Sequence, residues 1–241
     1  MALKAVLFDL DGTLWHQTEP VDYDVIQAQQ VECVRPLLPP LLPGLNLATL
    51  IANFWREWSP AFRALDNDPE LRELDSLAFL HQFLDAMGAR VSVALAHDIW
   101  CAMDVPKMGF AVYDDLLETL EQIRIRNIRT AVVTNRVDAR LEEHLTSFGI
   151  AVDAVVSSAH VGYRKPHPAV FEAALRRLDV SPEEAIEVGD SYEVDVLGAK
   201  RAGMKTVLKL NEREDRLEWV ADYKIRKLSE LLPVLDSLAN A

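Results

Sequence analysis

Short apolar runs, partly β-branched and closed by polar or glycine residues, recur at the start of the chain and through its second half. This pattern is typical of buried β-strands, and amphipathic stretches with helical spacing lie between the later runs. Strands that alternate with such helices predict right-handed βαβ units and a parallel sheet covered on both faces. The expected strands are 5–10, 128–134, 154–157, 185–189 and 205–208, and the expected helices are 116–126, 137–148, 168–178 and 194–202.

Between about residues 21 and 103 the alternation stops, and apolar positions recur at helical spacing only. We therefore expect a helical cap domain inserted after the first strand. The boundaries that this pattern predicts are residues 18–106 for the cap, and residues 1–17 together with 107–241 for the core. The expected cap helices are 25–38, 47–65, 71–87 and 93–103.

Composition matters mainly for what it excludes. Half of the 241 residues are hydrophobic and 26% are charged, which is the balance of a globular protein. The net charge of −13 repels nucleic acids and anionic membrane surfaces. The two cysteines lie far apart and suggest neither a disulfide framework nor a zinc site. The N-terminus does not have the pattern of a signal peptide, and no apolar run reaches the length of a membrane span. We expect a cytoplasmic protein with no nucleic-acid partner and no membrane partner.

Polar residues with catalytic potential follow several of the expected strands or begin the loops after them. Because the carboxyl ends of parallel strands meet at one edge of a sheet, where ligands bind in such folds, we expect these side chains to form a single site. The residues are Asp9, Asp11, Thr134, Asn135, Lys165 and Asp190.

These residue types suit phosphoryl transfer. Asp9 and Asp190 offer the carboxylate oxygens that Mg²⁺ prefers. Asp9 can also attack phosphorus and form an aspartyl-phosphate, while Lys165 and the metal neutralise the charge that gathers there. Asp11, two residues further on, can protonate the leaving group and later activate water. Thr134 can hold a phosphoryl oxygen.

In order and spacing, these residues resemble the four motifs of the haloacid dehalogenase-like (HAD) hydrolases. The matching segments are Asp9-Leu10-Asp11-Gly12-Thr13-Leu14, Thr134-Asn135, Lys165-Pro166 and Gly189-Asp190-Ser191 through Asp195. The resemblance spans nearly the whole chain. It implies an α/β fold with a Rossmannoid parallel sheet core and an inserted all-helical cap, as in the phosphoglycolate phosphatase-like members.

The resemblance also implies roles for individual residues. By analogy with the family, Asp9 is the nucleophile and a metal ligand, and Asp11 is the general acid/base and binds the metal through its backbone carbonyl. Asp190 is a metal ligand, and Asp195 supports the metal shell. The side chains implied to bind the substrate phosphate are Thr134, Asn135 and Lys165.

Two residues of the first motif separate the branches of the family. Asp11 favours phosphate over halide, because dehalogenases, whose leaving halide needs no proton, lack this second aspartate. Thr13 favours a phosphatase, since sugar phosphomutases commonly carry a small apolar residue there. We predict a HAD-like phosphoric monoester hydrolase, dependent on Mg²⁺, that acts on a small phosphorylated metabolite as a monomer or homodimer. A sugar phosphomutase and a non-catalytic phospholigand-binding protein remain alternatives.

Overall fold

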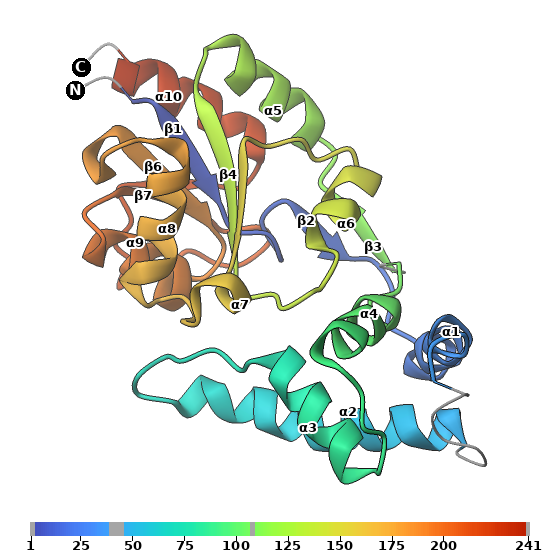
Figure 1. Cartoon of the computed structure of the whole chain (residues 1–241). Coiled ribbons are helices and arrows are strands. Elements are labelled where there is room, and N and C mark those ends of the chain that lie inside the picture. The colour runs from blue at the N-terminus through green and yellow to red at the C-terminus, as the bar shows by residue number, and fades with distance from the viewer. Residues whose placement is uncertain (1–2, 39–45, 107–108, 240–241) are drawn as a thin grey trace.

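The computed structural model describes residues 3–38, 46–106 and 109–239, and Figure 1 shows a twisted sheet with helices on both faces. Neighbouring strands in this six-stranded sheet are parallel. The predicted α/β fold with a parallel sheet core is therefore confirmed. Across the sheet, the strands are β5 (Ala154–Ser157), β4 (Arg129–Thr134), β1 (Ala5–Phe8), β6 (Ala185–Gly189), β7 (Lys205–Lys209) and β8 (Tyr223–Ile225).

Two hydrophobic clusters cover the two faces of the sheet. Successive side chains of a strand point to opposite faces, so Val6 and Phe8 of β1 join one cluster and Ala5 and Leu7 join the other. The first cluster includes α5 (Leu116–Ile125), α6 (Leu141–Ser147) and α10 (Leu231–Ala239). The second includes α8 (Pro168–Leu178) and α9 (Leu197–Arg201). The shorter elements are α7 (Ser158–Val161), a π-helical turn (Tyr192–Val196) and three 3₁₀ turns (Leu65–Asn67, Pro182–Glu184 and Leu228–Glu230).

Four helices pack together beyond the carboxyl ends of the strands (Figure 1), and they share a separate hydrophobic cluster. All four begin after a capping side chain that accepts a hydrogen bond from the first turn, supplied by Asp22, Asn46, Asp75 and Ser92. The division into core and cap domains stays a prediction, and its boundary at residue 107 lies outside the described residues. The helices are α1 (Tyr23–Val34), α2 (Leu47–Ala64), α3 (Ser76–Ala86) and α4 (Val93–Met103).

Some elements differ from the sequence prediction. β2 (Trp15–Gln17) and β3 (Phe110–Val112) form an antiparallel pair that joins the two connections to the cap helices; no local pattern signals a pairing over such a separation. The helix expected over 71–87 begins only at Ser76, after its cap Asp75. The helix expected over 137–148 begins at Leu141.

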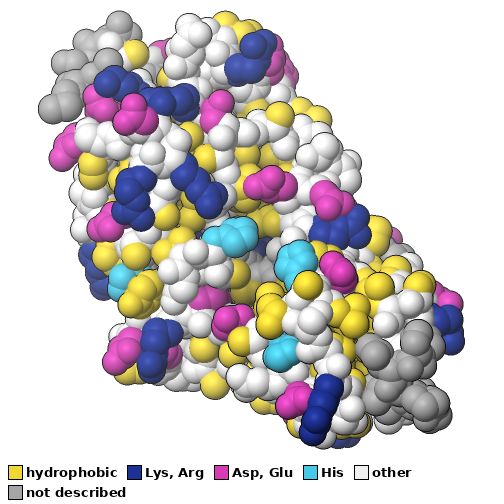
Figure 2. Space-filling model, viewed as in Figure 1, with side chains coloured by type: hydrophobic (Ala, Val, Ile, Leu, Met, Phe, Trp, Pro, Cys, Tyr) yellow, Lys and Arg dark blue, Asp and Glu magenta, His cyan; other side chains and the backbone are white. Residues whose placement is uncertain are grey.

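The surface and the helix lengths add two observations. On the face seen in Figure 2, acidic and basic side chains are interspersed, and no large basic patch gathers there. Among the helices in the described ranges, none combines the length and the apolar composition that crossing a bilayer requires.

Candidate active site

Three of the sequence-selected residues meet in the interior at the carboxyl edge of the sheet. The ammonium of Lys165 donates to Oδ1 of Asp9 and to Oδ1 of Asp195, each at 2.7 Å. Its third hydrogen bond goes to the backbone carbonyl of Val133, also at 2.7 Å. Asp9, Lys165 and Asp195 are all buried. The structure thus forms one compact charged cluster from segments that lie far apart in the sequence.

The sheet order explains this convergence. β1 pairs with β4 on one side and with β6 on the other. The residues that end or follow these strands, namely Thr134, Asp9 and Asp190, consequently reach the same edge of the sheet. The amide of Asp9 continues the ladder by donating to the carbonyl of Val188 at 2.9 Å. Adjacent parallel strands therefore bring the first, second and fourth motifs together.

Two glycines allow the acidic groups to approach the backbone closely. A Cβ added to Gly189 would lie 2.3 Å from Cβ of Asp195. A Cβ added to Gly12 would lie 2.3 Å from Oδ2 of Asp190, and the φ of Gly12 is +78°, a region that favours glycine. Any larger residue at either position would displace an aspartate of the site.

The acidic cluster fits a hard divalent cation. Carboxylate oxygens of Asp9, Asp190 and Asp195 lie within 4.8 Å of one another. An all-oxygen donor set of this kind suits Mg²⁺. Asp195 already accepts hydrogen bonds on both of its oxygens, from Lys165 and from the backbone amide of Ser191 at 2.9 Å. Asp9 likewise accepts on both of its oxygens, from Lys165 and from the hydroxyl of Thr13 at 3.1 Å. Hydrogen bonding alone therefore does not separate metal ligand from supporting residue in this cluster.

Burial and charge act in opposite directions on these groups. Burial raises the pKa of Asp9 to about 7, although Lys165 works to lower it. Burial also raises the pKa of Asp190, and neighbouring Asp195 adds to this effect, while Arg213 opposes it from 3.1 Å. Burial would lower the pKa of Lys165, but Asp195 and Asp9 outweigh it and raise that pKa. Since a metal binds the ionised carboxylate, metal affinity should increase as the pH rises through the pKa of Asp9.

Thr134 and Asn135 lie beside this cluster. Thr134 is buried at the end of β4, and its hydroxyl accepts a hydrogen bond from the amide of Arg136 at 3.2 Å. The side-chain amide of Asn135 holds the backbone of Lys165 at both ends, accepting from its N–H at 2.7 Å and donating to its carbonyl at 3.1 Å. Asn135 therefore fixes the lysine loop, and its contact with phosphate stays a prediction.

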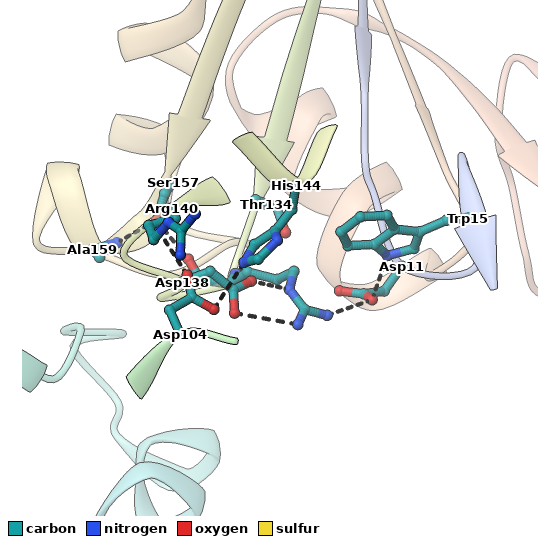
Figure 3. Close-up of polar contacts among 10 residues, drawn as sticks. Asp11, Trp15, Asp104, Thr134, Asp138, Arg140, His144, Ser157 and Ala159 are labelled. Carbon is teal, nitrogen blue, oxygen red and sulfur yellow. Dashed lines mark hydrogen bonds and ion pairs between the residues drawn. The ribbon is translucent and has the colours of Figure 1, made fainter. Parts of the chain in front are cut away.

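The carboxylate of Asp11 lies beside the indole ring of Trp15 (Figure 3). The Asp11 side chain is 47% exposed and accepts hydrogen bonds from Nε1 of Trp15 at 2.8 Å and from Nη1 of Arg136 at 2.9 Å. The guanidinium of Arg136 also pairs with Asp138 and lies 5.3 Å from the centre of the Trp15 ring. Sequence reasoning missed Arg136, although it follows the second motif directly.

The turn after Asp11 is held by a second group that sequence reasoning missed. The carbonyl of Gly12 accepts hydrogen bonds from Nδ2 of Asn211 at 2.9 Å, from the hydroxyl of Tyr113 at 3.0 Å and from Nζ of Lys209 at 3.2 Å. Lys209 is buried, and burial lowers its pKa to about 8. Three donors on one carbonyl fix the backbone that carries Asp11.

Glu187 is a further buried group that the sequence interpretation passed over, although its charge within the apolar run of β6 was a usable signal. Its side chain is buried, and among the described residues neither carboxylate oxygen has a hydrogen-bond partner. Burial raises the pKa of Glu187 well above its ordinary value; Lys165 opposes this effect, and Asp195 and Asp9 add to it. The neutral, protonated form is therefore favoured in the folded chain.

Glu187→Met is expected to raise the free energy of unfolding by about 1–3 kcal/mol, because it removes an unsatisfied buried carboxyl and keeps an unbranched side chain. With its raised pKa, the folded chain retains a proton that the unfolded chain releases above its lower pKa. Wild-type stability should consequently fall as the pH rises above 4.5, the ordinary pKa of a glutamate, and the gain in the variant should grow with it.

Denaturant unfolding at several pH values measures the effect of this substitution. Glu57→Met, at an exposed position in the middle of α2, is the matched control and should leave stability nearly unchanged. A destabilised Glu187→Met variant would show that the carboxyl makes a favourable contact.

A sequence profile of the haloacid dehalogenase-like hydrolases matches residues 3–203 of the chain. A glyceraldehyde 3-phosphate phosphatase of Methanopyrus kandleri is 32% identical over 247 residues, and the match covers 99% of each chain. Both matches include all four motifs and the helical segment between the first two.

Solved structures agree with this assignment. A HAD phosphatase from Thermococcus onnurineus has a TM-score of 0.60 at 27% identity, covering 97% of this chain and 98% of that one. A 2-haloacid dehalogenase from Pseudomonas syringae pv. Tomato DC3000 has a TM-score of 0.63 at 26% identity, covering 98% of both chains. Profile, full-length relative and fold all lead to one conclusion: the chain belongs to the haloacid dehalogenase-like hydrolase family.

Proposed function

We propose that the chain is a Mg²⁺-dependent phosphatase that hydrolyses a small phosphomonoester through an aspartyl-phosphate on Asp9. The observation that carries this proposal is the buried cluster in which Lys165 bridges Asp9 and Asp195 at 2.7 Å, beside Asp190. A carboxylate nucleophile, a fixed cation and a set of oxygen ligands for a metal are the components that phosphoryl transfer needs. The phosphatases among its relatives support the same reaction class.

The reaction follows from the placement of these groups. Asp9 attacks phosphorus with one carboxylate oxygen, the bond from phosphorus to the leaving oxygen breaks, and Asp11 gives that oxygen a proton. Asp11 then takes a proton from water, which attacks the phosphorus of the aspartyl-phosphate and frees both phosphate and Asp9. Lys165 neutralises charge at Asp9 throughout. Bound Mg²⁺ would supply positive charge to the phosphoryl oxygens, held by Asp9 and Asp190.

Asp11 has to reorient before it can transfer a proton. In the structure its carboxylate accepts hydrogen bonds from Trp15 and Arg136 (Figure 3). The ion pair to Arg136 is partly exposed and contributes little, whereas Trp15 is buried, so its N–H must find another acceptor when Asp11 turns away. The hydrogen bonds to the carbonyl of Gly12 meanwhile keep the turn in place. A rotation of the Asp11 side chain alone would thus bring the acid towards the leaving oxygen.

The relative from Methanopyrus kandleri, which is similar over its full length, suggests the substrate class. Its name specifies glyceraldehyde 3-phosphate, a short phosphorylated aldehyde. We accordingly propose a phosphorylated sugar or sugar fragment of few carbons as the substrate. The cap helices lie beyond the carboxyl edge of the sheet, where they can exclude water and limit substrate size (Figure 1).

Removal of metal tests the proposal. Phosphate release from glyceraldehyde 3-phosphate and from a generic aryl phosphate should fall about a hundredfold when a chelator strips the enzyme, because charge on the phosphoryl group is then poorly neutralised. Added Mg²⁺ should restore it. Full activity after exhaustive chelation would contradict the metal requirement. Faster isomerisation than hydrolysis of sugar phosphates would favour the mutase, and binding without turnover across a phosphate panel would favour a non-catalytic protein.

A further inference from the structure

The connection between α2 and α3 reaches from the cap helices to the loop that carries Lys165. The amide of Arg164 donates to the carbonyl of Leu71 at 2.7 Å, and the amide of Glu73 donates to the carbonyl of Gly162 at 3.0 Å. An antiparallel bridge pairs Arg72 with Tyr163 between these two bonds. In Figure 1 this connection lies at the end of the cap helices opposite to β2 and β3, the side of the two covalent connections.

A buried ion pair reinforces this contact. Nη1 of Arg164 lies 3.2 Å from Oε1 and 3.3 Å from Oε2 of Glu73. The two side chains are only 11% and 1% exposed. The guanidinium also lies 4.6 Å from the centre of the Phe62 ring on α2. The amide of Leu74 also donates to Oε1 of Glu73 at 2.8 Å, and the exposed Asp66 lies 3.6 Å from Arg164. Because burial of a carboxylate costs free energy unless it is paired, docking of the cap segment and pairing of Glu73 with Arg164 favour each other.

Arg164 is the residue directly before Lys165. From the core side, Asn135 holds the N–H and the carbonyl of Lys165. From the cap side, Leu71 and Glu73 hold Arg164. The loop is therefore fixed between two independent supports, and only one of them belongs to the sheet. Undocking of the cap would remove the second support one residue away from the lysine that bridges Asp9 and Asp195.

We propose that Arg164 is a positioning residue that, by receiving Glu73, couples docking of the cap segment to the placement of Lys165 against Asp9. The site is then fully assembled only with the cap docked over it. The catalytic consequence rests on the phosphatase function proposed above, whereas the coupling between Glu73, Arg164 and Lys165 is a property of the chain alone.

Amide hydrogen exchange, resolved by residue, tests the coupling without any substrate. Glu73→Gln removes the charge and keeps the shape. The amides of Arg164 and residue 73 should exchange about tenfold to a hundredfold faster in this variant, and the amide of Lys165, bonded to Asn135, should accelerate with them. The amide of Val132 in β4 should be unaffected, which excludes global unfolding as the cause.

Arg72→Gln is the matched control, because it removes an exposed pair with Asp68 in the same segment and leaves the backbone bridge intact. Its exchange should resemble that of the wild type. Should Glu73→Gln fold poorly, Glu73→Asp keeps the charge on a shorter side chain and should raise exchange in the same three amides by a smaller factor.

The outcomes separate the parts of the proposal. Unchanged exchange at Arg164 in both Glu73 variants would overturn the docking role, and faster exchange at Arg164 with an unchanged amide at Lys165 would overturn the coupling. In kinetics, Glu73→Gln should lower kcat about tenfold with a smaller change in KM, since positioning of Lys165 acts on the reacting state. A wild-type chain without phosphatase activity would refute the proposed function, and the exchange data would still decide the coupling.

Discussion

Asp9→Asn is expected to lower the rate of phosphate release by about 10⁴-fold or more, the largest effect of any single substitution in this chain. The amide cannot attack phosphorus as a carboxylate does, so the covalent route is closed. Asparagine has nearly the same shape, and Lys165 keeps its bonds to Asp195 and to the carbonyl of Val133. The loss should therefore reflect chemistry and not a collapse of the site.

Two measurements check this expectation. Acid-quenched wild-type enzyme should carry the mass of one phosphoryl group on the peptide that contains Asp9, and the variant should carry none. Asp85→Asn makes the same chemical change at an exposed position at the end of α3 and should leave turnover unaltered. Retention of more than about one-tenth of wild-type activity by Asp9→Asn would exclude Asp9 as the nucleophile.

The fold was most predictable where burial leaves a strong pattern. β6 and α8 begin and end at the residues predicted for them, because a strand buried on both faces is mainly apolar, here with Glu187 as the exception, and α8 has a wide apolar face. β8 lies at the sheet edge and spans only Tyr223–Ile225, too few residues for any period to appear. α10 was not predicted either, although Leu231 and Leu235 show helical spacing.

The segment before α3 shows why a periodic pattern can mislead. Leu71 and Leu74 continue the helical spacing of α3 towards the N-terminus, so the sequence predicted a longer helix. Asp75 instead caps α3, and Leu71 has a φ of +54°, which ends any regular element there. The backbone of this segment bonds to the loop at Gly162 and Arg164. Such contacts between distant segments leave no local signal.

The same distinction applies to the site. Asp9 after β1 and Lys165 on the loop before α8 meet across 156 positions, and the motifs predicted that meeting. The motifs do not specify side-chain direction. Local packing decides that Asn135 bonds to the backbone of Lys165 and that Asp11 bonds to Arg136. It also leaves the carboxyl of Glu187 without a hydrogen-bond partner in the described part of the chain.

Asp11→Asn is expected to have an effect that depends on the leaving group. For an alkyl phosphate, whose leaving oxygen must be protonated, turnover should fall about 10³-fold. For a nitrophenyl phosphate the first step needs no proton, so formation of the aspartyl-phosphate should be slowed by less than about tenfold. The second step still lacks its base. The variant should therefore release a burst of nitrophenol equal to the amount of enzyme and then stall as phosphorylated Asp9.

The substitution Asp11→Asn should disturb the structure around position 11 very little. Asparagine can still accept from Nε1 of Trp15, and the ion pair lost to Arg136 is partly exposed and contributes little to stability. Rapid-quench kinetics with both substrates, and the mass of the quenched protein, give the two rates and the trapped intermediate. Asp85→Asn again serves as the control. Equal losses for both substrates without a burst would assign Asp11 a structural role at the Gly12 turn, because a general acid must discriminate between leaving groups by their need for a proton.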